Sequence, residues 1–425
     1  AAIDEADRLV EEAEAIGYKP LLAKALLYRG KLSLNLTAEV EPQFETLQRA
    51  LYIALESKVD EVAAEAMAHM LFVRGRLPGG AAARALEDLD HYRAFVSRLP
   101  SANRLRGLLL NNAAVVTYVA GDVVGARALH EEALRAKQAG DVGELEIAYT
   151  VANLALLEDD PDAKAQRMRD AVQMFERALG PRHPTTIQAR LSASSHTRDP
   201  LAAREILRPG CDAILRYSPT DPPQLALCLA SLAHHSAEAG DDEEARAALR
   251  RAVALLSEGS VEGGLVRAVD VTLIRGLAAL DGEGSAEAVE DLRQALADRP
   301  GDAWWRRIER AELELVLGLH LRKGGDLAGA AEALQAAIDG FVAAEATVRD
   351  VLREQRLARA RVALADVLLA APRPGAADLD RAAELLAEAT RWYREGGDAY
   401  ASRLGEVRAL EATLAMHRSE RRARQ

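Results

Sequence analysis

Aromatic residues and cysteine are both scarce in this sequence. Phe, Trp and Tyr together make up 4% of the 425 residues, and because sheets prefer aromatic and β-branched residues, this composition disfavours a β-rich fold. The cysteines are Cys211 and Cys228, and two cysteines in so long a chain do not form a disulfide framework. We interpret them as two small buried side chains in a reducing compartment. A redox pair is the alternative, with no CxxC spacing to favour it.

The sequence also lacks a long apolar run and a signal peptide. No apolar stretch approaches the roughly 20 residues needed to cross a bilayer. The first residues, Ala1 to Glu5, have no basic start followed by an apolar core. These absences predict a cytoplasmic protein without membrane insertion. Because the sequence has no initiator Met, we interpret it as a piece of a longer protein.

The sequence has fewer basic residues than acidic residues. The formal net charge is −12, from 54 basic and 66 acidic residues. A net acidic chain is a poor default binder of nucleic acid, because the phosphates repel it. We interpret the short basic run at the C-terminus, residues 418–424, as a solvated helix end. We therefore expect no nucleic-acid partner.

Helix-forming residues with helical spacing are abundant. Apolar residues recur at steps of three and four, which is the period of an α-helix. Prolines and glycines fall between these segments, where one helix ends and the next begins. The glycines in such turns are Gly17, Gly121, Gly240 and Gly325. This punctuation predicts about twenty helices joined by short turns.

One pattern recurs along the chain: Ala, three residues, an apolar residue, two residues, then Ala. Copies begin at Ala6, Ala126, Ala171, Ala245, Ala288, Ala330 and Ala382. Positions i, i+4 and i+7 share one helix face, and small residues at two of them suit a helix packed tightly on its neighbour. His130 occupies the apolar position of one copy.

A second small residue lies twelve positions before several copies. These residues are Ala114, Ala233, Gly276 and Gly318. One unit therefore reads as a helix with a small crossing residue, a tight turn, and a second helix with the alanine face. The clearest copy combines Gly318, the turn at Gly325 and the face that begins at Ala330.

This unit resembles the tetratricopeptide repeat. The segments 110–113 and 178–184 resemble its kinesin-light-chain-like subtype, and the segment 17–23 resembles the repeat regions attached to large bacterial serine/threonine kinases. The resemblance implies an all-α fold, a right-handed superhelical solenoid of antiparallel helix pairs.

The resemblance also implies the organisation of the chain. We expect one solenoid over residues 1–425, with N-terminal repeats at 1–195, C-terminal repeats at 221–396 and a terminal capping helix at 397–425. The match is poor at 196–220, where Pro209 and Gly210 are expected to interrupt the second helix. We interpret that segment as a degenerate repeat or a hinge.

The sequence contains no recognisable catalytic signature. It has no phosphate loop ending in Lys-Ser or Lys-Thr, no HExxH and no kinase HRD or DFG element. We therefore predict that the chain is not an enzyme, with no catalytic residues, no metal site and no cofactor. His234 and His235 are adjacent, but neighbours on a helix point about 100° apart, which disfavours a shared metal.

Four residues are candidates for contact with a partner. Asn112 and Asn153 each precede a small residue by two positions, and a column of Asn side chains could hold a peptide backbone in a concave groove. The alternative is that they bond only to neighbouring turns. Trp304 and Trp305 are either an exposed anchor for a partner or packing residues between repeats.

These features predict a scaffold for protein–protein interaction that binds a peptide or protein in its groove. The kinase-like resemblance implies the docking or sensory region of a larger bacterial signalling protein, such as a serine/threonine kinase. The alternative is a ligand- or peptide-sensing regulatory domain whose superhelix changes shape on binding.

Overall fold

The structure is a computed structural model that describes residues 2–36, 40–77, 81–217, 222–258, 285–298, 304–345 and 351–424, with residues 274, 276 and 277. Every regular element in these residues is a helix, and the number of helices agrees with the expected twenty or so, so the all-α solenoid class is confirmed. The chain divides into two compact units, residues 1–158 with 166–179, and residues 159–165 with 180–425.

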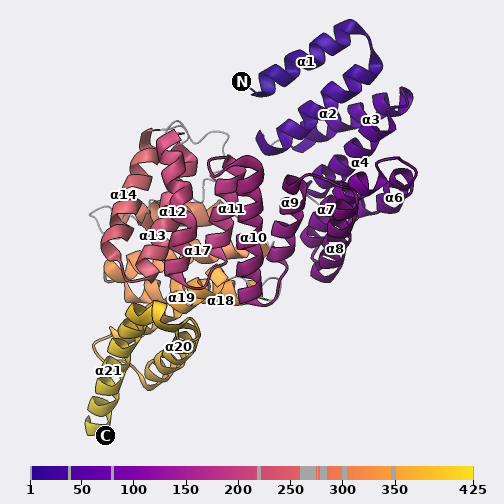
Figure 1. The fold of residues 1–425 in the computed structure, drawn as a ribbon. Helices are drawn as coiled ribbons and strands as arrows, with labels where there is room; N and C mark the ends of the chain where they lie inside the picture. Colours follow the sequence, from indigo (N-terminus) through magenta and orange to yellow (C-terminus); the bar gives the residue numbers. More distant parts are fainter. Residues whose placement is uncertain are drawn as a thin grey trace. The chain divides into compact units, whose positions relative to one another are not determined.

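In the first unit, most helices that are consecutive in the chain pack against each other (Figure 1). Between α4 and α7, two short helices extend the connection, and α4 also packs directly on α7. The helices are α1 (Ala2–Ile16), α2 (Lys19–Leu36), α3 (Val40–Glu56), α4 (Asp60–Gly75), α5 (Ala81–Leu86), α6 (Leu89–Ser97), α7 (Ala102–Val119), α8 (Val123–Ala139), α9 (Glu144–Leu156) and the larger part of α10 (Pro161–Leu179).

The second unit continues the pattern of helix pairs. Its main pairs are α11 with α12, α13 with α14, α17 with α18, and α19 with α20. Its elements are α11 (Pro184–Ser195), α12 (Pro200–Tyr217), α13 (Pro222–Glu238), α14 (Asp242–Glu258), α16 (Ser285–Ala297), α17 (Trp304–Lys323), α18 (Leu327–Glu345), α19 (Val351–Leu369), α20 (Ala376–Glu395), the 3-10 turn η1 (Gly397–Tyr400) and α21 (Ala401–Arg424).

The turn glycines lie where the sequence predicts them. Gly17, Gly121, Gly240 and Gly325 all have positive φ, between 72° and 94°. Residues with a side chain rarely adopt this conformation, so glycine ends one helix and starts the turn to the next at little cost.

The repeated alanine face is a packing face, as the copy on α18 shows. Ala330, Leu334 and Ala337 are all 0% exposed. Gly318 on α17 faces this surface, because a Cβ added there would lie only 2.6 Å from Cγ of Leu334. The small crossing residue is thus required for the two helices to approach. The copy that begins at Ala171 departs from this pattern, because its second alanine, Ala178, is exposed.

The expected interruption at Pro209 and Gly210 is not observed. α12 runs from Pro200 to Tyr217 with Pro209 in its interior. The proline is exposed, so its ring meets no neighbouring helix. The carbonyl that loses its helical donor at Pro209 is that of Glu205, which is also an exposed residue. Nη1 of Arg190 donates to the next carbonyl, that of Ile206, at 2.7 Å. Segment 196–220 lies within the second unit, and its role as a hinge stays a prediction.

The two cysteines are joined, so the interpretation as separate thiols is wrong. Cys211 on α12 and Cys228 on α13 form a disulfide with a Cα–Cα distance of 5.5 Å. Cys211 lies six residues before the end of α12 at residue 217, and Cys228 lies six residues after the start of α13 at residue 222. Because the two helices pack on each other as a hairpin, equal distances from the turn bring the two side chains level.

One helix in the described residues has the length and composition of a membrane span. Residues 327–344 of α18 have a mean hydropathy of 1.2. Ala330, Leu334 and Phe341 from this helix are buried in a hydrophobic cluster with α17, α19 and α20. That packing is typical of a helix in a protein core.

Candidate functional site

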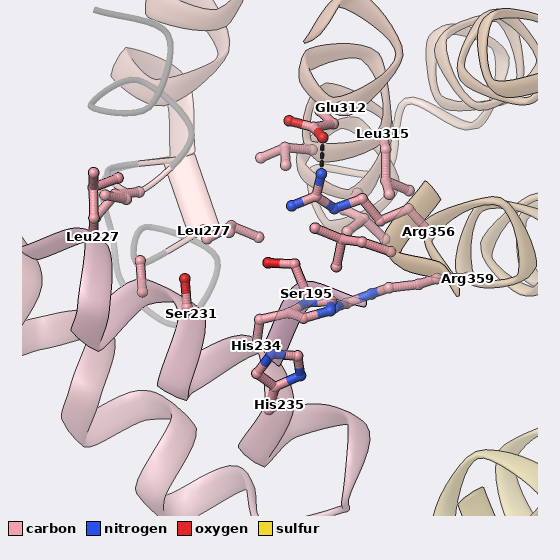
Figure 2. Close-up of a pocket in the computed structure, with 15 residues that line it drawn as sticks. Ser195, Leu227, Ser231, His234, His235, Leu277, Glu312, Leu315, Arg356 and Arg359 are labelled. Atoms are coloured by element: carbon pink, nitrogen blue, oxygen red, sulfur yellow. Dashed lines mark ion pairs between the residues drawn. The ribbon is translucent and has the colours of Figure 1, made fainter. Parts of the chain in front are cut away.

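The second unit contains a cavity of about 210 Å³ (Figure 2). Its walls come from α11, α13, α17 and α19, with Ile274 and Leu277 between them in sequence. Helices α11, α13, α17 and α19 are the first members of their pairs, and first helices line the concave surface of a solenoid of this kind. The cavity therefore lies on the surface where the sequence predicts a partner.

Much of the cavity wall is apolar. Leu227 comes from α13, Leu315, Val316 and Leu319 come from α17, and Leu352 comes from α19. Leu315 and Val316 are also members of the hydrophobic clusters that hold α17 against its neighbours. Because these side chains are packed from behind, the wall is preformed.

Two arginines from α19 enter the cavity. Arg356 forms an ion pair with Glu312 on α17, and both line the cavity (Figure 2). Arg359, one helical turn further along, lies 3.7 Å from the carboxylate of Glu238 on α13. The cavity thus combines apolar walls with guanidinium groups, an arrangement typical of binding sites that recognise one charged and one apolar group.

Glu238 also contacts the C-terminal helix α21. The Glu238 side chain is 0% exposed, and Arg403 on α21 lies 3.2 Å from its carboxylate. Arg403 also donates to the carbonyl of Ala237 at 2.9 Å, where the last carbonyls of α13 attract positive charge. Glu238 is therefore shared between the cavity and the C-terminal helix.

A chain of hydrogen bonds also joins the cavity to the C-terminal elements. Nε2 of His234 lies 2.9 Å from Oε1 of Gln355. Nε2 of Gln355 donates to the hydroxyl of Tyr400 at 3.1 Å, and that hydroxyl donates to the carbonyl of Arg198 at 2.7 Å. Because Gln355 Oε1 can only accept, the chain fixes the proton of His234 on Nε2.

His235 is the more buried of the adjacent histidines, at 3% exposed. Burial, followed by the neighbouring His234, lowers its pKa to about 3. In the unfolded chain a histidine titrates near 6.5, so between pH 6.5 and 3 the unfolded state binds more protons than the folded state. Stability therefore falls as the pH is lowered through this range.

We expect His235 alone to lower the free energy of unfolding by about 2 kcal/mol between pH 7 and pH 5. Urea unfolding at a series of pH values measures this loss. His235→Gln should reduce the pH dependence by that amount. Equal pH dependence of the unfolding free energy in the wild type and His235→Gln would contradict a lowered pKa of His235 in the folded protein.

The structure places Asn112 and Asn153 in contacts between helices of the first unit. Asn112 is buried, and its Nδ2 donates to the carbonyl of Ala68 at 3.0 Å. Nδ2 of Asn153 donates to Oδ1 of Asn111 at 3.3 Å. The first bond joins α7 to α4, and the second joins α9 to α7. A role for either residue in partner binding stays a prediction.

Trp304 and Trp305 begin α17, and their side chains lie outside the described part of the chain. Their role as an anchor stays a prediction. Arg356 and Arg359 are not among the residues that the sequence predicts, although they are one helical turn apart on a helix that begins a pair. Many other arginines share that spacing, so the sequence alone carries no signal that selects these two.

A second cavity, of about 300 Å³, lies in the first unit. Three cations and three carboxylates line it, so their charges balance. Lys31 and Arg104 both pair with Glu65, and Lys137 pairs with Glu146. Among the described residues, no group of three or more His, Cys, Asp or Glu side chains could hold a metal ion. The cavity of the second unit is therefore the better candidate for a binding site.

Comparison with known proteins identifies the fold. No protein-family model matches this chain, and no curated protein matches it by sequence. The chain is similar in structure to the apo form of RapI, with 11% identity over 88% of this chain and 98% of that chain and a TM-score of 0.51. The chain thus has the fold of tetratricopeptide-like helical repeat proteins.

Two further solved structures match less closely. BtubC (BKLC) from P. vanneervenii is 17% identical over 63% of this chain and 94% of that chain, with a TM-score of 0.35. Acl4, an assembly chaperone of RpL4, is 16% identical over 67% of this chain and 97% of that chain, with a TM-score of 0.40.

Proposed function

We propose that this chain is a binding module for a peptide or protein segment, and that the cavity of the second unit receives the ligand. The observation that carries the proposal is the preformed cavity of about 210 Å³, built by four first helices and lined by apolar and guanidinium groups. Recognition of a peptide needs an apolar pocket and a small number of oriented polar groups, and the cavity supplies both.

The finer proposal is that the chain serves as the docking or sensory region of a larger bacterial signalling protein, such as a serine/threonine kinase. It is supported by the resemblance of segment 17–23 to kinase-attached repeat regions.

A sensing function is the second candidate, and a specific observation favours it. The hydrogen-bond chain from His234 through Gln355 to Tyr400 links the cavity to the C-terminal elements. A ligand that displaces His234 would disturb the docking of α21, which would change the shape of the second unit.

The test is selection of peptides from a displayed random library on the immobilised chain. Wild-type protein should enrich related sequences, and Ser231→Trp should lose them, because Ser231 lines the cavity and a tryptophan there fills it. Val342→Trp is the matched control, since Val342 is 44% exposed on α18 and does not line the cavity.

Retention of the same peptides by Ser231→Trp would exclude the cavity as their site. Failure of the wild type to enrich any peptide would remove the proposed function. Small-angle scattering with and without a selected peptide separates the two candidates, because only the sensing function requires a change of shape.

A further inference from the structure

Helix α1 has the sequence of a second helix, and within the described part of the chain no first helix precedes it. Its alanine pattern begins at Ala6, as the pattern of α18 begins at Ala330. Ala6 and Ala13 are each 2% exposed, because α1 packs on α2, the helix that follows it. In the pair α17–α18, by contrast, the second helix also packs on the first helix before it. α1 therefore has one packing face that is covered and another that is open.

The pair α17–α18 shows which residues form the open face of α1. In that pair Ala333 of α18 is buried in a cluster with residues of α17. A Cβ added at Gly340 of α18 would lie 3.0 Å from Cβ of Ala311 on α17. Counted from the first alanine of each pattern, the equivalent residues of α1 are Leu9 and Ile16, which are 44% and 65% exposed. The outer helices of repeat arrays normally present polar faces to water, so these two apolar side chains suit the packing of a further helix.

Helix α21 occupies the position of a first helix. It packs on both helices of the preceding pair, α19 and α20, as α19 packs on both α17 and α18. In α17, α19 and α21, which start at residues 304, 351 and 401, a leucine followed by a small residue lies at the same distance from the start of the helix. These dipeptides are Leu317-Gly318, Leu364-Ala365 and Leu414-Ala415. Gly318 packs on α18 and Ala365 is 0% exposed, whereas Ala415 is exposed. The surface of α21 that would receive a second helix is therefore open.

The charges of α1 and α21 are complementary. α1 contains six acidic residues and one basic residue, and α21 contains six arginines and three glutamates. The acidic residues in the first turn of α1 are Asp4 and Glu5, and the basic residues in the last turn of α21 are Arg421, Arg422 and Arg424. An antiparallel pair of these helices places the first turn of one beside the last turn of the other. Opposite charges at those turns would attract each other and fix the direction of pairing.

We propose that this chain associates with a second copy of itself, and that α21 of one copy and α1 of the next form a complete helix pair. In this pair Ala415 takes the place of Gly318, and Val10 takes the place of Leu334, which lies against Gly318 in the pair α17–α18. Leu9 and Ile16 are then covered. Because two different surfaces meet, each copy keeps one open surface, and association continues beyond a dimer. This inference does not depend on the cavity or on its ligand.

Sedimentation velocity of the whole chain over a concentration series tests the proposal. We expect the average mass of the wild type to rise with concentration through the dimer to larger species, because a contact between two different surfaces does not close. Raising the salt concentration should weaken this association, since the charged turns of α1 and α21 lie at the edge of the contact and are screened.

Two variants block one surface each. Leu9→Glu with Ile16→Glu blocks α1, and Ala415→Glu blocks α21; all three positions are exposed, so both variants should fold, which circular dichroism checks. Each variant alone should associate at least roughly 10-fold more weakly than the wild type. An equal mixture of the two should form a dimer with one copy of each, because one variant retains α21 and the other retains α1. Val124→Glu, at a position of α8 that is 81% exposed, is the control and should associate as the wild type does.

Three outcomes would overturn the proposal. A wild type that stays monomeric over the whole series would show that a second copy does not cover these faces. Association of the wild type that stops at a dimer would show that one surface meets itself. Folded variants that associate as the wild type does, or that form no mixed dimer, would show that the contact lies elsewhere on the chain. None of these outcomes bears on peptide binding in the cavity, so the two proposals fail separately.

Discussion

Replacing Arg403 with alanine is expected to lower the free energy of unfolding of the second unit by about 3 kcal/mol. Glu238 is fully buried, and Arg403 supplies its nearest positive charge. Removal of one partner of a buried ion pair costs about 3–5 kcal/mol, because the other charge remains in the interior. Arg359 stays 3.7 Å from the carboxylate, which puts the expected loss at the lower end of this range.

Urea unfolding followed by tryptophan fluorescence measures this effect. The chain has three tryptophans, at 304, 305 and 392, and all three belong to the second unit. Arg408→Ala, on an exposed face of the same helix, should change stability by less than about 0.5 kcal/mol. Hydrogen exchange should show lost protection in α21 after Arg403→Ala. A loss below about 1 kcal/mol would mean that this ion pair does not hold the C-terminal helix in place.

The second large effect is expected at Gly240, in the turn between α13 and α14. Its φ is +83°, and a Cβ added there would lie 2.7 Å from Cβ of Ser402 at the start of α21. An alanine would therefore combine about 1 kcal/mol of backbone strain with about 2 kcal/mol from overpacking. We expect Gly240→Ala to lower the free energy of unfolding by about 3 kcal/mol.

Gly325 provides a matched control for this prediction. Its φ is also +83°, and nothing lies within 4 Å of the position of its Cβ. Gly325→Ala should therefore cost only the backbone strain, about 1 kcal/mol. In a Ser402→Gly background the cost of Gly240→Ala should fall to the same value, because the clashing carbon is absent. Equal costs at the two glycines in the wild-type background would show that α21 does not pack on this turn.

The sequence predicted the local parts of this fold well because they are determined by neighbouring residues. Positive φ at Gly121 and Gly325 follows from the need to reverse the chain within a few residues. Burial of Ala330, Leu334 and Ala337 follows from their spacing on one face of one helix. Each of these features depends only on residues within one helix or one turn, so a short stretch of sequence is enough to predict it.

The candidate site depends on contacts between residues that lie far apart in the sequence. His234 meets Gln355 across 121 positions, and Tyr400 meets Arg198 across 202 positions. The periodicity of α19 gives Arg353, Arg356 and Arg359 equal weight, but the structure buries Arg353 at 1% exposed and leaves Arg359 partly open. Only the packing of helices from distant repeats distinguishes them.

Pro209 and Cys211 show two further limits of local reasoning. A proline inside a helix removes the hydrogen bond to the carbonyl four residues before it, but here Pro209 and Glu205, whose carbonyl is freed, are both exposed. Disulfide frameworks and CxxC motifs are recognised from the number and spacing of cysteines, and Cys211 and Cys228 match neither. A hairpin of two helices pairs residues at equal distances from its turn, and that geometry joins Cys211 to Cys228.

The bond between Tyr400 and Arg198 has a consequence for synthesis of the chain. Repeat arrays gain most of their stability from neighbouring repeats, so they can fold progressively as they leave the ribosome. Here a bond spans 202 positions, and at about 5–20 residues per second the tyrosine follows its partner by about 10–40 s. During that interval the ends of α11 and α13 lack their C-terminal cover. The second unit should therefore complete its cooperative fold only after η1 and α21 have emerged, and truncation before Tyr400 should leave a nascent chain that chaperones retain.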